Sequence, residues 1–243
     1  MASEYLKWKA RNEKPREKTV LTPAEKRANW WDYHKWHVGI GIVLLLIMFD
    51  LAKSALHIGE PQYDYQIAYV GSRTLPTDTV SAAETAFAAL GEDANGDGKV
   101  TVRLNQYAET GKTDQDTAAY SAASSVKLMA DLESCDSFFF LLEDPDRFQE
   151  QYEALSLPDG SFPKHGAYDW EDCCFSWTDC PALAGQELGS YTENILGEEF
   201  RGENTTILDQ LFLARRGFWN NQSIKNQAEC EDLWEKITKG ADS

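Results

Sequence analysis

The chain has 243 residues and a formal net charge of −17, and this charge is distributed unevenly. Residues 1–37 hold nine Lys and Arg against five Asp and Glu, a net charge of +4, whereas the remaining residues hold 14 against 35, a net charge of −21. So acidic a body repels phosphates, which excludes nucleic acid as a partner and favours cations, cationic partners or simple solubility.

An apolar run follows the basic segment, and residues 38–49 contain no polar side chain. With its flanks the run covers residues 37–58, which supplies the roughly 20 helical residues that a bilayer core requires. The stretch WWDYHKWH precedes it, and its aromatic residues suit a belt at the membrane surface. These features together predict a membrane-spanning helix.

The basic residues of the N-terminal segment all precede the apolar run, and positive charge marks the cytoplasmic side of a membrane protein. We therefore predict a cytoplasmic basic and aromatic tail over residues 1–36, one transmembrane helix over 37–58 and an extracytoplasmic domain over 59–243. Two alternatives remain. A cleaved signal peptide would have an unusually long charged leader and no A-x-A site. A core helix of a soluble domain leaves the tryptophans and the one-sided charge unexplained.

The outer part begins with two strand patterns that flank a helical one. Residues 64–71 alternate apolar and polar side chains and end at Gly71, which predicts a strand. Residues 75–91 place apolar side chains at helical spacing and end at Gly91, a residue suited to stopping a helix. Residues 99–108 alternate again, which predicts a second strand.

The centre of the outer part repeats this order of helix and strand. Residues 112–134 carry a broad apolar face at helical spacing, and residues 138–142 form an apolar run typical of a central strand. Asp144 followed by Pro145 predicts the start of another helix, with Asp144 as its N-cap.

The last third of the chain is less regular. Residues 156–204 have no clean period, so we predict an irregular, cysteine-containing insertion there, either a long loop packed by its own side chains or a small subdomain. Residues 206–219 predict a strand, and residues 228–240 predict a final helix. Because strands and helices alternate, the predicted fold class is α/β, with an open, largely parallel sheet that has helices on both faces. A single N-terminal transmembrane helix precedes it.

The stretch from KLMADLES through DSFFFLLEDPDRFQ to ALSLP resembles part of one lobe of extracellular solute-binding proteins. The whole order, with a basic and aromatic anchor before DYQIAYVG and NGDGKVTVRLNQY, is similar to uncharacterised membrane-anchored extracytoplasmic proteins of Gram-positive, clostridia-like bacteria. The resemblance implies an outward-facing binding lobe and carries no catalytic motif. Solute-binding proteins typically have two lobes, whereas this body is long enough for about one.

The run GEDANGDGKVTVRL begins in the same way as many calcium loops. Asp93, Asn95 and Asp97 would supply side-chain oxygens, and Lys99 would supply its backbone carbonyl. An EF-hand places a bidentate glutamate at the position that Leu104 occupies here, so the run is not an EF-hand.

A calcium ion bound at this loop needs a further carboxylate, for which Glu92 and Glu109 are the candidates. Such an ion would brace the joint between the first helix and the second strand of the outer part. The alternative is a polar turn without metal, because Asp, Asn and Gly are the residues that turns commonly use.

Polar and charged side chains follow the predicted strands, and ligands of open α/β sheets bind beyond the carboxyl ends of strands. Arginines at this edge would suit an anionic ligand, because a guanidinium can hold an anion with two hydrogen bonds. The alternative is that the arginines lie on solvated surface or pair with acids. The candidate ligand-binding residues are Arg73, Asn105, Tyr107, Glu143, Arg215 and Arg216.

Five cysteines, Cys135, Cys173, Cys174, Cys180 and Cys230, lie in the outer body, where disulfides are chemically allowed. The candidate pairings are Cys173 or Cys174 with Cys180, and Cys135 with Cys230. The sequence leaves the connectivity open. A zinc site has less support, because there is no C-x-x-C pair and no histidine nearby.

The chain has no G-x-S-x-G, P-loop or H-E-x-x-H motif, and no G-x-G-x-x-G after a strand. We therefore predict a non-enzymatic, membrane-anchored binding or interaction protein with calcium as its candidate cofactor. Its predicted partners are the membrane and a small-molecule ligand or a membrane protein complex. One alternative is an accessory subunit of a transporter or envelope complex without its own ligand pocket. Another is a thiol-dependent enzyme that uses the cluster around Cys173, Cys174 and Cys180.

Overall fold

The structure is a computed structural model of the chain and describes residues 4, 6–8, 11, 22–55, 62–109, 115–163, 170–195, 197–219 and 222–241. The chain divides into two compact units, Met1–Pro61 and Gln62–Ser243. A single long helix dominates the first unit, and the described strands all lie in the second.

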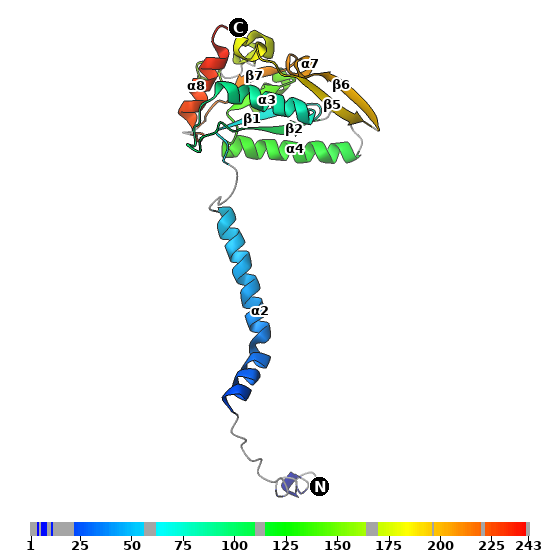
Figure 1. Cartoon of the computed structure of the whole chain (residues 1–243), viewed down its shortest axis with the longest axis vertical. Helices are drawn as coiled ribbons and strands as arrows, with labels where there is room; N and C mark the ends of the chain where they lie inside the picture. Colours follow the sequence, from blue (N-terminus) through cyan, green and yellow to red (C-terminus); the bar gives the residue numbers. More distant parts are fainter. Residues whose placement is uncertain are drawn as a thin grey trace. The chain divides into compact units, whose positions relative to one another are not determined.

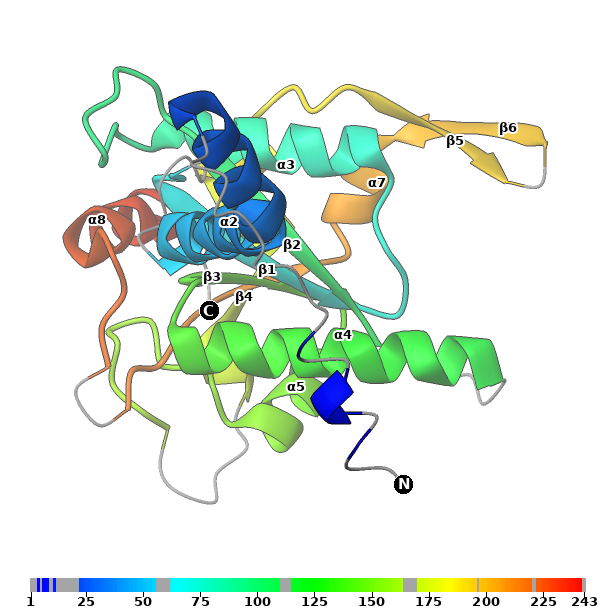
Figure 2. The same cartoon turned by 90° about the horizontal axis from the view of Figure 1, so that it is seen from below.

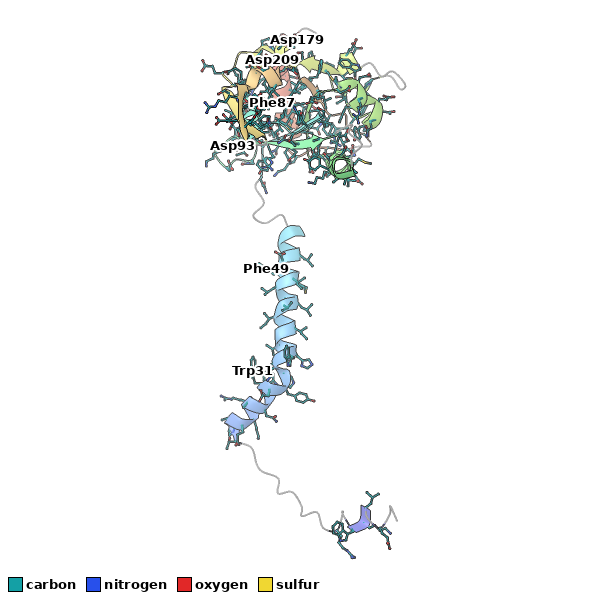
Figure 3. All side chains as sticks on the ribbon, turned by 90° about the vertical axis from the view of Figure 1, so that its right-hand side faces the viewer. Trp31, Phe49, Phe87, Asp93, Asp179 and Asp209 are labelled. Carbon is teal, nitrogen blue, oxygen red and sulfur yellow. The ribbon has the colours of Figure 1, made fainter. Side chains whose placement is uncertain are left out.

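The long helix α2, Pro23–Ala55, begins well before the predicted span. Within the described residues it is the one helix that is long and apolar enough to cross a membrane, and its apolar window is not buried in protein. Its side chains point outward, as Trp31 and Phe49 do in Figure 3. This exposure does not fit a core helix. A helix of this length and composition suits a membrane span or a signal sequence.

In the second unit, the described strands include a five-stranded sheet of order β2-β1-β3-β7-β4. Strand β1, Tyr65–Gly71, pairs in parallel with β2, Val102–Ala108, and with β3, Phe139–Leu142. Strand β7, Phe212–Arg215, is antiparallel to β3 and to β4, Cys174–Ser176. The predicted α/β class is confirmed, but the sheet is mixed: parallel on one side of β3 and antiparallel on the other.

Helices cover both faces of this sheet, as predicted. Helix α3, Thr77–Leu90, and helix α8, Gln227–Thr238, pack on one face around Phe87 and Trp234. Helix α4, Gln115–Ser134, and helix α5, Pro145–Tyr152, cover the other face. Figures 1 and 2 show α3 and α4 on opposite sides of β1 and β2. The sheet is therefore buried on both faces, which explains the apolar run of β3.

The predicted N-cap is present at the start of α5. The side chain of Asp144 accepts a hydrogen bond from the backbone N–H of Arg147 at 3.0 Å, and Pro145 occupies the first turn. An aspartate at this position satisfies one of the free N–H groups at a helix start.

The prediction was wrong for part of the last third of the chain. The segment predicted to be irregular contains β4, the short helix α6, Pro181–Ala184, and a hairpin of β5, Ser190–Ile195, with β6, Glu198–Glu203. The segment predicted as one strand over residues 206–219 does not form a single strand. Helix α7, Asn204–Leu208, comes first, and only the four residues of β7 pair as a strand.

Candidate functional site

The site is defined by the strand order around β1. The chain leaves β1 for α3 and returns as β2 on one side, whereas β3 lies on the other side of β1 and continues into α5. Helices α3 and α5 belong to opposite faces of the sheet, so the loops after β1 and β3 diverge. Such a reversal of strand order opens a crevice at the carboxyl ends of the strands, where α/β proteins commonly bind ligands.

A cavity of about 210 Å³ lies at this crevice. Its walls come from the end of β1, the end of β2 and the start of α5, so that residues far apart in the sequence meet here. The lining residues are Val70, Gly71, Ser72, Glu109, Glu143, Asp144, Arg147 and Phe148.

Glu143, the residue after β3, is fixed by two hydrogen bonds from β1 and its following loop. The hydroxyl of Tyr69 donates to Oε1 at 2.7 Å, and the backbone N–H of Ser72 donates to Oε2 at 2.7 Å. Burial is the main cause that raises the pKa of Tyr69 well above its usual range, and the hydrogen bond to the Glu143 carboxylate is the second cause. The hydroxyl therefore remains protonated and acts as a donor.

Gly71 makes this arrangement sterically feasible. A Cβ atom at this position would lie 2.6 Å from Cζ of Tyr69 and 2.7 Å from Cδ of Glu143, closer than real Cβ atoms approach other atoms. The side chains of Tyr69 and Glu143 therefore fill the space that any side chain at residue 71 would need.

Glu109, the residue after β2, is the most buried carboxylate of the cavity and is only 8% exposed. Its Oε1 accepts hydrogen bonds from the hydroxyl of Ser125 on α4, at 2.8 Å, and from the hydroxyl of Tyr152 on α5, at 2.5 Å. Burial, together with the bond to Glu109, raises the pKa of Tyr152 to about 12. The two helices thus hold the carboxylate at the cavity wall.

The lining carries three carboxylates, Glu109, Glu143 and Asp144, and one guanidinium, that of Arg147. This composition gives the cavity a net negative charge and favours a positively charged ligand group. In the described ranges no three His, Cys, Asp or Glu side chains are grouped so as to hold a metal ion.

A second cavity, of about 600 Å³, shares Ser72 and Glu143 with the first. Arg73 lines it, together with Tyr191 of β5 and residues of α7 and the segment that follows. Of the predicted ligand-binding residues, Arg73 and Glu143 are thus brought together at one edge of the sheet.

Asn105 and Tyr107 belong to β2 but make other contacts. The side-chain amide of Asn105 donates to Oε1 of Gln66 at 3.1 Å. The hydroxyl of Tyr107 donates to the buried carboxylate of Asp131 on α4 at 2.6 Å. Tyr107 packs in the core beneath α4 and does not line either cavity.

Arg215 and Arg216 lie at the opposite edge of the sheet, because β7 runs antiparallel to β3. Arg215 pairs in register with Phe139 at the beginning of β3, and its guanidinium forms a 2.5 Å ion pair with Glu231. Arg216 donates to the backbone carbonyls of Asp131 and Leu132 at the end of α4. The expectation that both arginines share an edge with Arg73 assumed a parallel β7 and was wrong.

The DANGDG loop lies between α3 and β2, at the amino end of β2, and its acidic side chains bind its own backbone. Oδ1 of Asp93 accepts from the N–H of Gly96 at 2.7 Å, and Oδ2 accepts from Gly98 at 2.7 Å. Asn95 accepts from the N–H of Asp97 at 2.9 Å, and Asp97 accepts from Lys99 at 2.9 Å.

The two carboxylates that the sequence suggested as further calcium ligands have other partners in the structure. Glu109 is at the far end of β2, and seven strand residues span roughly 20 Å at about 3.3 Å each. Glu92 forms a 2.6 Å ion pair with Lys236 on α8. The carboxylate that does reach the loop is Asp64, which accepts from the N–H groups of Ala94 and Asn95 at 2.9 and 2.8 Å. Calcium binding at this loop stays a prediction.

The cysteines are buried, and Cys135, Cys174, Cys180 and Cys230 are free thiols. Each proposed disulfide needs one of these four, so neither pairing is formed. The sheet separates the cysteines of the first pairing, because Cys173 and Cys174 pack on the face of α4 and Cys180 packs on the face of α3. Burial raises the pKa of both Cys180 and Cys230 to about 12, which keeps these thiols protonated and unreactive near neutral pH.

The interpretation of the sequence missed most of the cavity. It named Glu143 as a ligand-binding candidate but left out Arg147, and it considered Glu109 only as a calcium ligand. The signal that could have found Glu109 is its position directly after an alternating strand, which equals that of Glu143 after β3.

No protein family, curated protein or solved structure matches the chain. The resemblance to a solute-binding lobe therefore stays a prediction.

Proposed function

We propose that this chain is a membrane-anchored binding protein whose outer domain holds a small organic cation in the cavity at the carboxyl ends of β1 and β3. The observation that carries the proposal is the buried Glu109, held by Ser125 and Tyr152 at the wall of a cavity that also contains Glu143. An ammonium group that donates to these carboxylates would form charge-assisted hydrogen bonds, which are stronger than neutral ones.

The size of the cavity supports a short ligand. About 210 Å³ accommodates a chain of a few carbon atoms, and two pinned carboxylates in one cavity suit a ligand with one or two ammonium groups. Since hydroxyl and N–H donors already hold both carboxylates, the ligand would meet a site that is largely formed before binding.

The test uses butane-1,4-diamine as a probe and butane-1,4-diol as its neutral counterpart, titrated into the full chain in uncharged detergent micelles by calorimetry. We expect the diamine to bind and the diol not to bind. The variant Glu109→Gln should weaken the diamine at least tenfold, because the amide oxygen can still accept from Ser125 and Tyr152 while the negative charge is lost.

The matched control is Glu150→Gln, which removes one negative charge from an exposed position on the same helix as Tyr152. We expect this variant to bind the diamine as the native chain does. Equal binding of the diol, or equal weakening by both substitutions, would refute the proposed site.

We further propose that helix α2 spans the membrane with the N-terminus in the cytoplasm and the acidic domain outside. The nine basic residues ahead of the apolar run and the acidity of the remaining chain support this orientation. A protease added to intact cells should then degrade the domain and leave the N-terminal segment protected. The reverse pattern, or release of the whole domain as a cleaved product, would contradict the proposed anchor.

A further inference from the structure

The β5–β6 hairpin is a separate two-stranded sheet, and the described strands of the main sheet do not pair with it. Figures 1 and 2 both show it extending from the body beyond the end of α3. Residues of β6 are exposed along the whole strand except at Gly202, which is half-buried. Two-stranded hairpins are marginally stable in water by themselves, so a long exposed one needs a reason to persist.

The root of the hairpin is fixed to the first turn of α3. Oδ2 of Asp78 accepts from the backbone N–H of Thr192 at 3.0 Å. Asn204, which directly follows β6 and is 2% exposed, accepts from the hydroxyl of Thr79 at 2.7 Å and donates to the carbonyl of Leu188 at 2.8 Å. The arm thus projects from a rigid base.

One face of the projecting part combines an exposed aromatic ring with acidic side chains. Phe200 is 47% exposed and pairs in register with Glu193, and directly opposed residues share a face of a sheet. Glu198 lies two residues before Phe200 and therefore on the same face. Nearer the root, the ring of Tyr191 covers Gly202, where a Cβ atom would lie 2.8 Å from the ring.

The charge of the arm identifies the partner by its chemistry. Residues 190–203 contain four glutamates and one arginine, a net charge of −3. Two copies of this arm would repel each other, and nucleic acid and anionic lipid would be repelled as well. A segment that carries Lys or Arg next to apolar residues complements both Phe200 and the glutamates around it.

We propose that the β5–β6 hairpin is a docking arm for an extended, basic segment of a partner protein. Each strand of a two-stranded sheet has an outer edge with unpaired backbone groups, and such edges accept an added strand. The partner's backbone would pair with an edge of the arm, its basic side chains would contact Glu193 and Glu198, and its apolar side chains would pack on Phe200. This surface is independent of the cavity at Glu109.

The test measures binding of a fluorescent 12-residue peptide of alternating Lys and Val to the full chain in uncharged detergent micelles. Fluorescence anisotropy at physiological salt should show binding. The double variant Glu193→Lys/Glu198→Lys should weaken binding at least tenfold. Phe200→Ser leaves the charge unchanged and should weaken it about threefold to tenfold, through loss of the apolar contact.

The matched control is Glu150→Lys/Glu235→Lys, which changes the net charge equally at exposed positions on α5 and α8. We expect it to weaken binding less than twofold. Equal weakening by both double variants would show attraction by overall charge and overturn the proposal. Absence of peptide binding would also overturn the proposal. So would self-association of the chain in sedimentation analysis that Phe200→Ser abolishes, because the arm would then bind a second copy of the chain.

Discussion

The two ends of strand β2 are both acidic and use their acids differently. At the amino end, Asp93 and Asp97 of the DANGDG loop accept hydrogen bonds from backbone N–H groups of their own loop. At the carboxyl end, Glu109 accepts from hydroxyl groups of two helices and lines a cavity. At the end with a recognisable motif, the acidic side chains already accept hydrogen bonds from their own loop. At the end without a motif, the carboxylate lines a cavity that a ligand could fill.

This difference shows how an acidic group becomes available to a ligand. Local turns bring carboxylates close to their own backbone, where N–H groups compete for the oxygens. Strand ends instead project side chains beyond the sheet, where neighbouring loops diverge and leave a crevice. Four changes would break or sharpen the comparison, in order of decreasing expected effect.

The largest effect is expected for Asp64→Ala at the amino end. The buried Asp64 accepts from the N–H groups of Ala94, Asn95 and Thr101 and from the hydroxyl of Thr101. Loss of these charge-assisted bonds should lower the free energy of unfolding by about 3 kcal/mol. Urea unfolding of the full chain, with and without the substitution, measures this loss in the free energy of unfolding.

The comparison variant for this loss is Asp93→Ala. Asp93 is exposed, so water can replace its bonds, and we expect a cost of only about 1 kcal/mol. Equal losses in the two variants would mean that the loop, rather than its buried brace, determines stability at this end.

The next effect is expected for Gly71→Ala at the carboxyl end. The added methyl group would clash with Tyr69 and Glu143 and should destabilise the fold by about 2 kcal/mol, as overpacking does. In a Tyr69→Leu background the same substitution should cost less, because the ring is gone and Glu143 loses the hydroxyl group that holds its side chain near residue 71. A thermal melt of the four proteins in this cycle tests the coupling, and strictly additive losses would refute the steric role of Gly71.

A smaller effect is expected from calcium at the DANGDG loop. If the ion binds as the sequence predicts, a tenfold excess over the dissociation constant stabilises the fold by about 1.4 kcal/mol. The melting temperature should rise when millimolar calcium is added to chelator-treated protein, and Asp93→Asn/Asp97→Asn should remove this rise. A melting temperature insensitive to both chelator and calcium would reduce the loop to a polar turn.

The smallest effect concerns Tyr152 at alkaline pH. Its pKa is about 12 in the folded protein, against an ordinary value of 10.0, so the unfolded chain releases this proton first as pH rises. The contribution of Tyr152 to the free energy of unfolding is therefore fully present below pH 10 and is lost between about pH 10 and 12. Tyr152→Phe should make the fall in unfolding free energy over this range shallower. Tyr120→Phe, which removes an exposed hydroxyl on α4, should leave the slope unchanged.

Local pattern in the sequence was sufficient for several elements. The alternation of DYQIAYVG predicts β1, the apolar run before Glu143 predicts a strand buried on both faces, and Asp144 followed by Pro145 predicts the start of α5. The apolar run after WWDYHKWH likewise predicts a helix suited to a membrane. Each of these signals is contained in neighbouring residues.

The hairpin could not be predicted in the same way. Because β6, which pairs with β5, is exposed on both faces except at Gly202, it lacks the apolar alternation that marks a half-buried strand. Their pairing depends on the fixed root at Thr192 and Asn204, which involves residues of α3 that are distant in the sequence.

The sequence by itself determined the long apolar helix, the alternation of strands and helices in the first half of the second unit, and the acidity of that unit. Only the tertiary structure decided that β7 runs antiparallel, which places Arg215 at the far edge from Arg73. Tertiary structure also decided that Glu109 and Glu143 line one cavity. The physical reason is that strand order and direction follow from packing between distant segments, whereas a hydrophobic pattern is the same for a strand of either direction.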